Sequence, residues 1–161
     1  MSGDGIKPIA VIRIKGRVGV RYDMEDTLRL LNLKRKFWAT IVPSTPTYMG
    51  MLFKVKDLTT YGEVDLETIR LLLERRGYTK FGNKITDEWL AENTEFKDVE
   101  DLASKIYSCE VRLSRLDWIK PYFRLSPPKG GFKRSTKKPF SSGGELGFRG
   151  LEINTLLRRM I

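Results

Sequence analysis

The chain has 161 residues, of which 30 are lysine or arginine and 20 are acidic, giving a net charge of +10; it contains no histidine and one cysteine. Without histidine, the usual general base near neutral pH and the commonest metal ligand are both missing. One cysteine, Cys109, can form neither an internal disulfide nor a thiolate zinc site. We therefore expect no cofactor and no metal site. A chain of this length can bury a sizeable core, so we expect one domain with an extension.

No run of about 18 apolar residues could span a membrane, and the first residues lack the charged and apolar regions of a secretion signal. We therefore expect a cytoplasmic protein with no membrane partner. No pattern of residues indicates a small-molecule substrate.

Positive charge gathers in the two outer parts of the chain. Residues 1–56 carry 11 basic and 4 acidic side chains, residues 57–110 carry 7 and 13, and residues 111–161 carry 12 and 3. This distribution is typical of a protein bound to nucleic acid at both ends, with its middle turned to solvent or to another protein. A basic domain with ordinary solvated faces is the alternative.

Apolar and β-branched patterns predict a strand–helix–strand–helix–strand order over the first 64 residues. Strands are predicted over 8–14, 37–42 and 58–64, and helices over 24–33 and 46–56. Asp23 is suited to cap the first helix, and Ser44 or Thr45 the second, before a proline at the first helical position. This order is typical of an α+β fold in which two helices cover one sheet face.

Beyond residue 64 the pattern becomes helical. Helices are predicted over 66–76, 87–92 and 99–107, with caps at Asp65, Thr86 and Asp98, and a last helix is predicted over 151–160. We predict three segments in one compact chain. They are a β-α-β-α-β core at 1–64, an acidic helical subdomain at 65–108, and a basic C-terminal extension with its closing helix at 109–161.

The most basic stretch is residues 120–149, here called the basic arm. It holds eight lysines and arginines and a single acidic residue, Glu145, among pairs of prolines and glycines. Such a density of like charge repels itself in a free domain and is relieved by phosphates, so the arm predicts a polyanionic partner. Phe132 and Phe140 stand among these charges. Stacking on RNA bases and anchoring of the arm are both open for these two rings.

A second group of basic residues surrounds the first strand and the end of the first helix. Neutralisation of the helix dipole explains only part of it. Gly50, inside a predicted helix at a cost of roughly 1 kcal/mol against alanine, indicates close approach by another backbone, from a neighbouring element or a nucleic acid. We predict phosphate contacts for Arg13, Lys15, Arg17, Arg21, Lys34, Arg35, Lys36, Arg124, Lys129, Lys133, Arg134, Lys137, Lys138 and Arg149.

Three other motifs that could indicate nucleotide binding, catalysis or base stacking are better explained by turns, helix capping and packing. The glycine-rich stretch 143–150 lacks the preceding strand and the Lys-Ser/Thr end of a nucleotide-binding loop. Acidic pairs such as Asp87-Glu88 and Glu100-Asp101 stand where helix starts favour negative charge, so we interpret them as capping residues rather than catalytic acids. The three tryptophans lie in periodic apolar contexts that favour packing over base stacking.

Several separated motifs resemble the ribosomal protein thirty family of the large subunit. In the first half they are Ile9–Ile14, Asp26–Leu33 and Ile41–Asp57. In the second half, Ile85–Leu90, Phe123–Phe132 and Gly143–Gly147 resemble the long archaeal form, whose eukaryotic counterpart is called protein seven. The motifs occur in the family's order and span nearly the whole chain.

This resemblance implies a ferredoxin-like split β-α-β-α-β core with a three-stranded antiparallel sheet and an RNA-contacting extension. It implies a non-enzymatic structural constituent of the large ribosomal subunit, whose partners are ribosomal RNA and neighbouring large-subunit proteins, and no homo-oligomer. An RNA-binding assembly or processing factor outside the mature ribosome is the alternative; a hydrolase using carboxylates and a metal is a more distant one. The resemblance places at the RNA surface Thr45, Thr47, Tyr48, Gly50, Pro127, Pro128, Lys129, Gly130 and Gly131. Phe132, among the charges of the arm, is predicted as a further contact.

Overall fold

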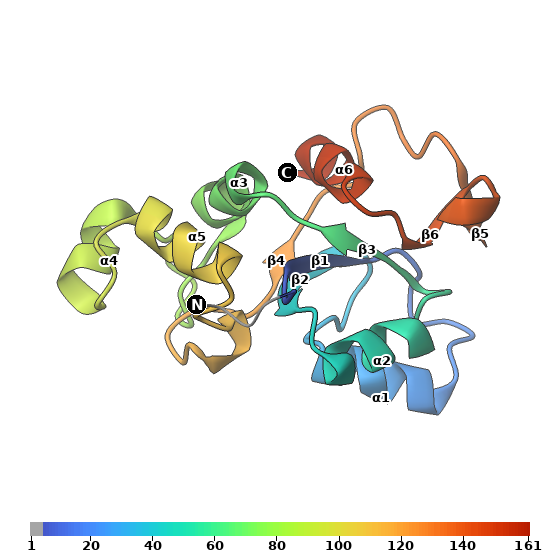
Figure 1. Ribbon diagram of the computed structural model, residues 1–161, viewed down its shortest axis with the longest axis horizontal. Coiled ribbons are helices and arrows are strands. Elements are labelled where there is room, and N and C mark those ends of the chain that lie inside the picture. Colours follow the sequence, from blue (N-terminus) through green and yellow to red (C-terminus); the bar gives the residue numbers. More distant parts are fainter. Residues whose placement is uncertain (1–4) are drawn as a thin grey trace.

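A six-stranded sheet with helices on both faces organises the chain in the computed structural model, which describes residues 5–161 (Figure 1). Its centre is β1 (Pro8–Arg13), flanked by β2 (Trp38–Pro43) and β3 (Thr59–Glu63), and both pairings are antiparallel. Every residue of β1 is buried, which explains its unbroken run of apolar residues. The expected α+β class and three-stranded antiparallel core are thus confirmed.

The sheet is larger than the sequence predicts, because the C-terminal extension adds three strands. β4 (Phe123–Arg124) pairs antiparallel with β2, and β6 (Gly144–Phe148) pairs parallel with β3. β5 (Ser135–Pro139) pairs parallel with β6 and forms the sheet edge. β4 has only two residues, β5 contains lysine and proline, and β6 contains glycine; these three residue types have low strand propensity, so only the long-range pairing defines the added strands.

Helices α1 (Tyr22–Leu30) and α2 (Pro46–Lys54) cover one sheet face (Figure 1). Their apolar residues, with those of the strands, form a cluster that includes Ile9, Leu28 and Leu52. The prediction that two helices cover one face is confirmed. The predicted start of α1 was wrong. The helix begins at Tyr22 after Arg21, so Asp23 lies in its first turn rather than at its cap. Acidic residues stabilise both positions, so the sequence alone does not separate them.

The other face carries α3 (Leu66–Arg76), α5 (Val99–Tyr107) and α6 (Glu152–Met160), with α4 (Asp87–Asn93) at the outer end (Figure 1). The side chains of Asp65, Thr86 and Asp98 cap α3, α4 and α5 as predicted. Two short 3-10 turns occur at Leu113–Arg115 and Phe140–Ser142. One large apolar cluster unites this layer, with members from all three predicted segments, such as Ile12, Leu72 and Leu157.

The tryptophans pack within the fold, as expected. Trp89 and Trp118 have ring centroids 5.4 Å apart, and Trp38 stacks on Tyr122 at 4.2 Å with an interplanar angle of 3°. β3 approaches the start of α6 so closely that a Cβ on Gly62 would lie 2.1 Å from the Gly150 carbonyl oxygen. Glycine is therefore required at this position.

Candidate nucleic-acid interface

The loop after β1 and the loop before β2 meet at one end of the sheet. β1 and β2 are antiparallel with Ile12 opposite Ala39, so the last residues of one lie beside the first residues of the other. The Phe37 N–H also donates to the Arg13 carbonyl at 2.7 Å. Four exposed basic side chains and one half-buried lysine share this end of the sheet: Arg17, Lys34, Arg35, Lys36 and Lys15. Arg21, also exposed, lies farther along the chain and pairs with Asp23 at 3.0 Å.

Arg13 has a structural role instead. Its side chain is fully buried, and its guanidinium donates to both carboxylate oxygens of Glu25, at 2.8 and 2.9 Å, and to the carbonyls of Lys15 and Leu33 at 2.8 Å. The hydrogen bond from Arg13 is the main reason why the pKa of Glu25 is lowered. Arg13 therefore supports the two basic loops from within, and its donors are already used in the fold.

The proline–glycine turn of the basic arm lies against the same end of the sheet. Lys15 and Lys36 of the two loops and Pro127, Gly131 and Phe132 of the turn line one open groove of about 490 Å³. We call it the aromatic groove, because Phe37 and Phe132 lie in it with ring centroids 6.0 Å apart. The remaining lining residues are Ile14, Gly16, Pro128 and Thr136. The fold thus brings two sequence-predicted groups together, although about 90 residues separate them.

Two arginines outside the predicted set hold this turn. The guanidinium of Arg159, on α6, donates to the carbonyls of Lys129, at 3.0 Å, and Gly131. Arg76, at the end of α3, donates to the Arg124 carbonyl at 3.2 Å and the Ser126 hydroxyl at 3.0 Å. Sequence analysis missed both residues, because a basic residue in the last turn of a helix has a sufficient local explanation in the helix dipole.

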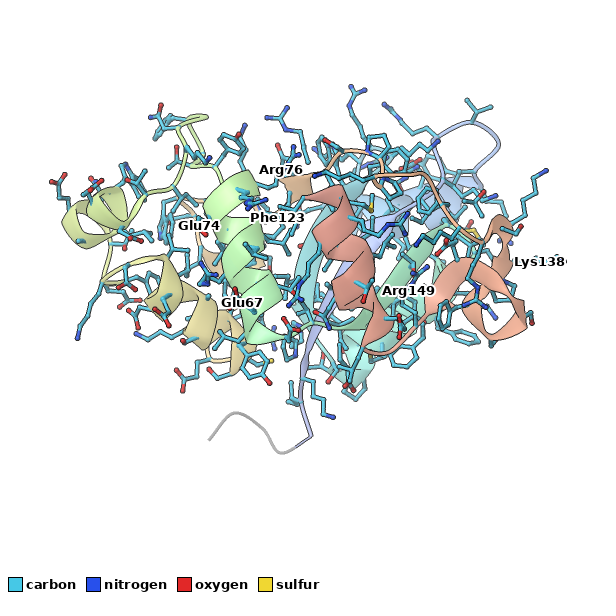
Figure 2. All side chains as sticks on the ribbon, turned by 90° about the horizontal axis from the view of Figure 1, so that it is seen from above. Glu67, Glu74, Arg76, Phe123, Lys138 and Arg149 are labelled. Atoms are coloured by element: carbon cyan, nitrogen blue, oxygen red, sulfur yellow. The ribbon has the colours of Figure 1, made fainter. Side chains whose placement is uncertain are left out.

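The outer part of the basic arm presents its lysines to solvent. Lys133, Lys137 and Lys138 are exposed, and no acidic residue within 5–161 forms an ion pair with them. Lys137 and Lys138 lie on the edge strand β5, and Lys138 projects at one extreme of the molecule (Figure 2). Arg124, Lys129 and Arg134 are likewise exposed. This surface continues the basic end of the sheet.

A buried ion pair attaches the arm to the core. Arg149 and Glu145 are almost fully buried, and the Arg149 guanidinium donates to the carboxylate of Glu145 and to the hydroxyl of Thr60 at 2.7 Å. The Phe140 ring contacts two guanidinium groups, with its centroid 4.3 Å from the guanidinium carbon of Arg134 and 5.0 Å from that of Arg149. Arg149 is therefore not exposed to a polyanion, and Phe140 anchors the arm. The sequence carried a signal for this ion pair, because Glu145 is the one acidic residue among the eight cations of the arm.

The resemblance also predicts RNA contacts on α2 and its cap, and these residues lie at the opposite end of the sheet from the basic loops. β2 runs from the basic end to Pro43, which pairs with Pro8 at the opposite end of the sheet, and α2 begins there. Thr45 caps this helix, Thr47 is exposed, and the Tyr48 ring lies 5.9 Å from the Arg112 guanidinium. No atom lies within 4 Å of a Cβ built on the exposed Gly50. The expected packing of Gly50 against a neighbouring element is therefore wrong.

The acidic helical subdomain predicted at 65–108 lies away from the outer part of the arm (Figure 1). Glu67 and Glu74 on α3 lie far from Lys138 of the arm (Figure 2). Two carboxylates accept hydrogen bonds from backbone N–H groups. Asp87 accepts from the Val99 N–H at 2.9 Å, and Asp98 accepts from the Asp101 N–H at 2.8 Å. The capping interpretation is confirmed for Asp98, whereas Asp87 lies in the first turn of α4 and accepts from the start of a neighbouring helix, α5. Among residues 5–161, no three His, Cys, Asp or Glu side chains come together as a metal site would need.

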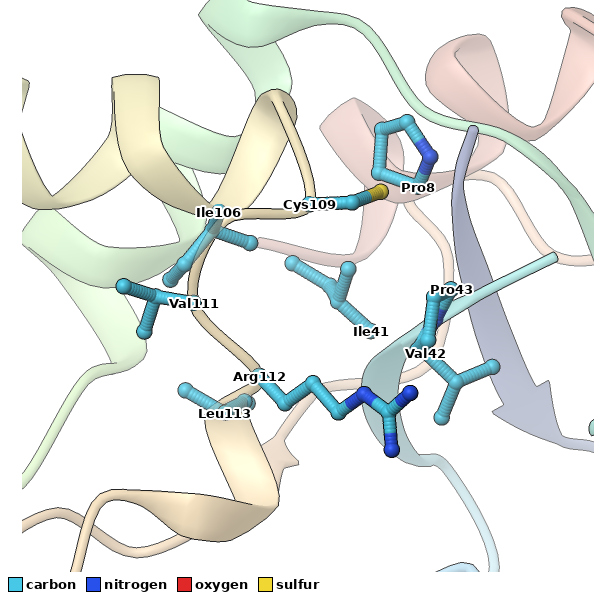
Figure 3. Close-up of a pocket in the computed structure, with 9 residues that line it drawn as sticks. All are labelled: Pro8, Ile41, Val42, Pro43, Ile106, Cys109, Val111, Arg112 and Leu113. Atoms are coloured by element: carbon cyan, nitrogen blue, oxygen red, sulfur yellow. The ribbon is translucent and has the colours of Figure 1, made fainter. Parts of the chain in front are cut away.

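The surroundings of Cys109 indicate an inert thiol. It lines a small cavity of about 10 Å³ with Pro8, Ile41, Ile106 and Leu113 (Figure 3). That space is about the minimum for one water molecule. Burial raises the pKa of the Cys109 thiol, which keeps it protonated near neutral pH. None of the described helices is both long enough and apolar enough to cross a bilayer.

Comparison with known proteins connects this geometry to one family. Residues 9–59 match the family described as ribosomal protein L30p/L7e. The whole chain is 55% identical to the large ribosomal subunit protein uL30 of Korarchaeum cryptofilum, 99% of which is covered. It is 46% identical to the protein of that name from Methanopyrus kandleri, over 92% of this chain and 100% of the relative. For Hyperthermus butylicus the identity is 48%, over 97% of this chain and 91% of the relative. The similarity therefore extends over the extension as well as the core.

Proposed function

Because the chain belongs to the ribosomal protein L30p/L7e family, we propose that it binds ribosomal RNA in the large ribosomal subunit and holds adjacent RNA elements in place. Members of this family are structural components of the ribosome and not enzymes. Neighbouring large-subunit proteins are further partners in this proposal. The acidic helical subdomain, which lies away from the outer part of the arm, is free to meet them.

The observation that carries the proposal is the meeting of two basic loops and the arm's turn around the aromatic groove. Cations gathered on one surface neutralise phosphates and release their counterions, so RNA binding should weaken steeply as salt concentration rises. The prolines restrict the backbone of the arm and Arg159 holds its turn, which suits recognition of RNA by form more than by sequence.

The proposed RNA-facing set is narrower than the sequence suggests. Arg13 and Arg149 are omitted, because both are buried and hydrogen-bonded within the fold. Thr45, Thr47, Tyr48 and Gly50 form a separate proposed contact on α2. Pro128 is also omitted, because it is buried. The main proposed surface consists of Lys15, Arg17, Arg21, Lys34, Arg35, Lys36, Arg124, Pro127, Lys129, Gly130, Gly131, Phe132, Lys133, Arg134, Lys137 and Lys138.

Quantifying the protein in large subunits washed at moderate salt tests this function. One copy per particle is expected, because a structural constituent stays with the mature subunit. A trace amount confined to immature particles would instead identify an assembly factor, and absence from both would overturn the proposal. In a parallel assay, purified protein should bind large-subunit RNA with a linear fall of log affinity against log salt concentration.

A further inference from the structure

Apolar and cationic residues line the aromatic groove together. Phe37, Phe132 and Pro127 supply apolar surface, and Lys15 and Lys36 supply positive charge. A nucleotide presents the matching pair of features, a flat base with two apolar faces and a charged phosphate a few ångströms away. Phosphate contacts alone require the lysines but not the rings.

The backbone holds Phe37 in an unusual conformation. Its φ is 68°, in the left-handed region that a residue with a side chain seldom adopts. Two hydrogen bonds fix it there: its N–H donates to the Arg13 carbonyl at 2.7 Å, and its carbonyl accepts from the Leu125 N–H at 3.2 Å. The Phe37 ring is therefore held beside the groove by a strained residue rather than placed by regular strand geometry.

Both rings are only half-buried, so each packs on the core and keeps some surface accessible. The Lys36 ammonium lies 5.0 Å from the centroid of the Phe37 ring and covers it in the free protein. Lys36 is exposed and has a flexible side chain, so a phosphate can draw the ammonium away and uncover the ring. Gly131, at φ 75°, also lines the groove, and no atom of residues 5–161 beyond its chain neighbours lies within 4 Å of a Cβ built on it, so no side chain crowds this part of the lining.

From this arrangement we infer that the aromatic groove takes one unpaired nucleobase of ribosomal RNA, stacked on Phe37 or Phe132, with its phosphate on Lys15 or Lys36. This inference rests on the proposed function and adds a base-stacking subsite to it. Stacking tolerates any base, because every base has a π-face, so the subsite selects an unpaired nucleotide rather than a sequence.

The salt dependence of RNA affinity distinguishes a contribution from base stacking from a contribution from phosphate contacts. Replacing a ring with leucine removes stacking but no charge. The variants F37L and F132L should therefore weaken binding to large-subunit RNA by about 5- to 100-fold at every salt concentration, with an unchanged salt slope. K36Q should instead flatten the slope. F81L is the matched control, because Phe81 is 89% exposed and lies outside the groove, and its affinity should equal that of the wild type.

A measurement on the wild-type protein does not depend on how the variants fold. A six-nucleotide oligoadenylate should shift the NMR signals of the Phe37 and Phe132 ring protons, whereas an abasic oligomer of equal length and charge should leave them in place. Equal shifts from both oligomers, or from neither, would overturn the subsite, as would folded F37L and F132L proteins with wild-type affinity. If the wild-type protein bound no large-subunit RNA, the proposed function would fall as well.

Discussion

The Arg149 guanidinium donates a hydrogen bond to the Glu145 carboxylate at 2.5 Å, and both side chains are buried, so the only acid of the basic arm neutralises a cation inside the fold. Glu145 also accepts from the backbone N–H of Arg134 at 3.1 Å. The pair therefore joins the two ends of the arm's outer loop to each other and, through Thr60, to β3.

Breaking this pair from one side should be costly. In Glu145→Leu the Arg149 charge stays buried without its partner, and we expect a loss of about 3–5 kcal/mol in the free energy of unfolding, measured by urea denaturation. The double variant Glu145→Leu, Arg149→Met should lose much less, since no uncompensated charge remains. Equal losses in the single and double variants would contradict the buried-pair argument. Glu67→Gln, which removes an exposed ion pair, serves as the control and should have no measurable effect.

The ion pair beneath the basic loops should give the stability a pH dependence. The pKa of Glu25 is lowered from its ordinary value of 4.5 by the hydrogen bond from Arg13. Its contribution to stability is thus complete above about pH 4.5 and is lost as the pH falls through the lower folded-state pKa. Urea denaturation between pH 7 and pH 3 should show Glu25→Gln less stable than the wild type at pH 7, with the difference shrinking below pH 4.5. A constant difference across that range would count against this linkage.

Gly50 should separate stability from RNA binding. It lies inside α2 with open space around it, so Gly50→Ala should raise the free energy of unfolding by roughly 0.5–1 kcal/mol. If α2 meets RNA at this point, the added methyl group should weaken RNA binding at the same time. Thermal unfolding and a filter-binding assay measure the two effects. Unchanged affinity would remove Gly50 from the proposed contacts, and Gly62→Ala, which cannot fit beside Gly150, should destabilise the protein.

The lysines of the arm should account for part of the salt dependence. The triple variant Lys133→Gln, Lys137→Gln, Lys138→Gln should weaken binding to large-subunit RNA and reduce the salt slope by up to about 3, since each phosphate contact contributes about 1. Its stability should not fall, because these side chains are exposed. The matched control neutralises three exposed lysines of the acidic helical subdomain, Lys80, Lys84 and Lys97. Equal loss of affinity in both triple variants would show only a dependence on net charge.

Local signals predicted the helices and the first three strands well. Thr45, Asp65, Thr86 and Asp98 each cap the helix that the sequence assigns to them, because capping depends on residues within one turn. β4, β5 and β6 were missed because their pairing joins distant segments, such as Thr60 with Gly147. Neither propensity nor periodicity carries that information.

The sequence predicted the residues of the candidate surface from their positive charge, and it could not show which of them are buried. Arg13 and Arg149 look like their exposed neighbours in the sequence, but each meets a carboxylate that only the fold brings close. Phe37 was predicted as the first residue of a strand, and its left-handed backbone was not foreseen. Composition predicts a polyanion-binding protein, whereas the groove and the supporting arginines require three-dimensional contacts.

The position of α6 has a consequence for synthesis. Its buried residues Ile153, Leu156, Leu157 and Met160 complete the apolar layer that covers β1 and β3. A chain emerging residue by residue exposes this sheet face until α6 follows, about 90 residues after β3. One face of the sheet can fold early against α1 and α2, while the other waits for contacts of high sequence separation, which form slowly. During that interval, the unfinished apolar face is the part of the nascent chain most in need of a chaperone or an early RNA partner.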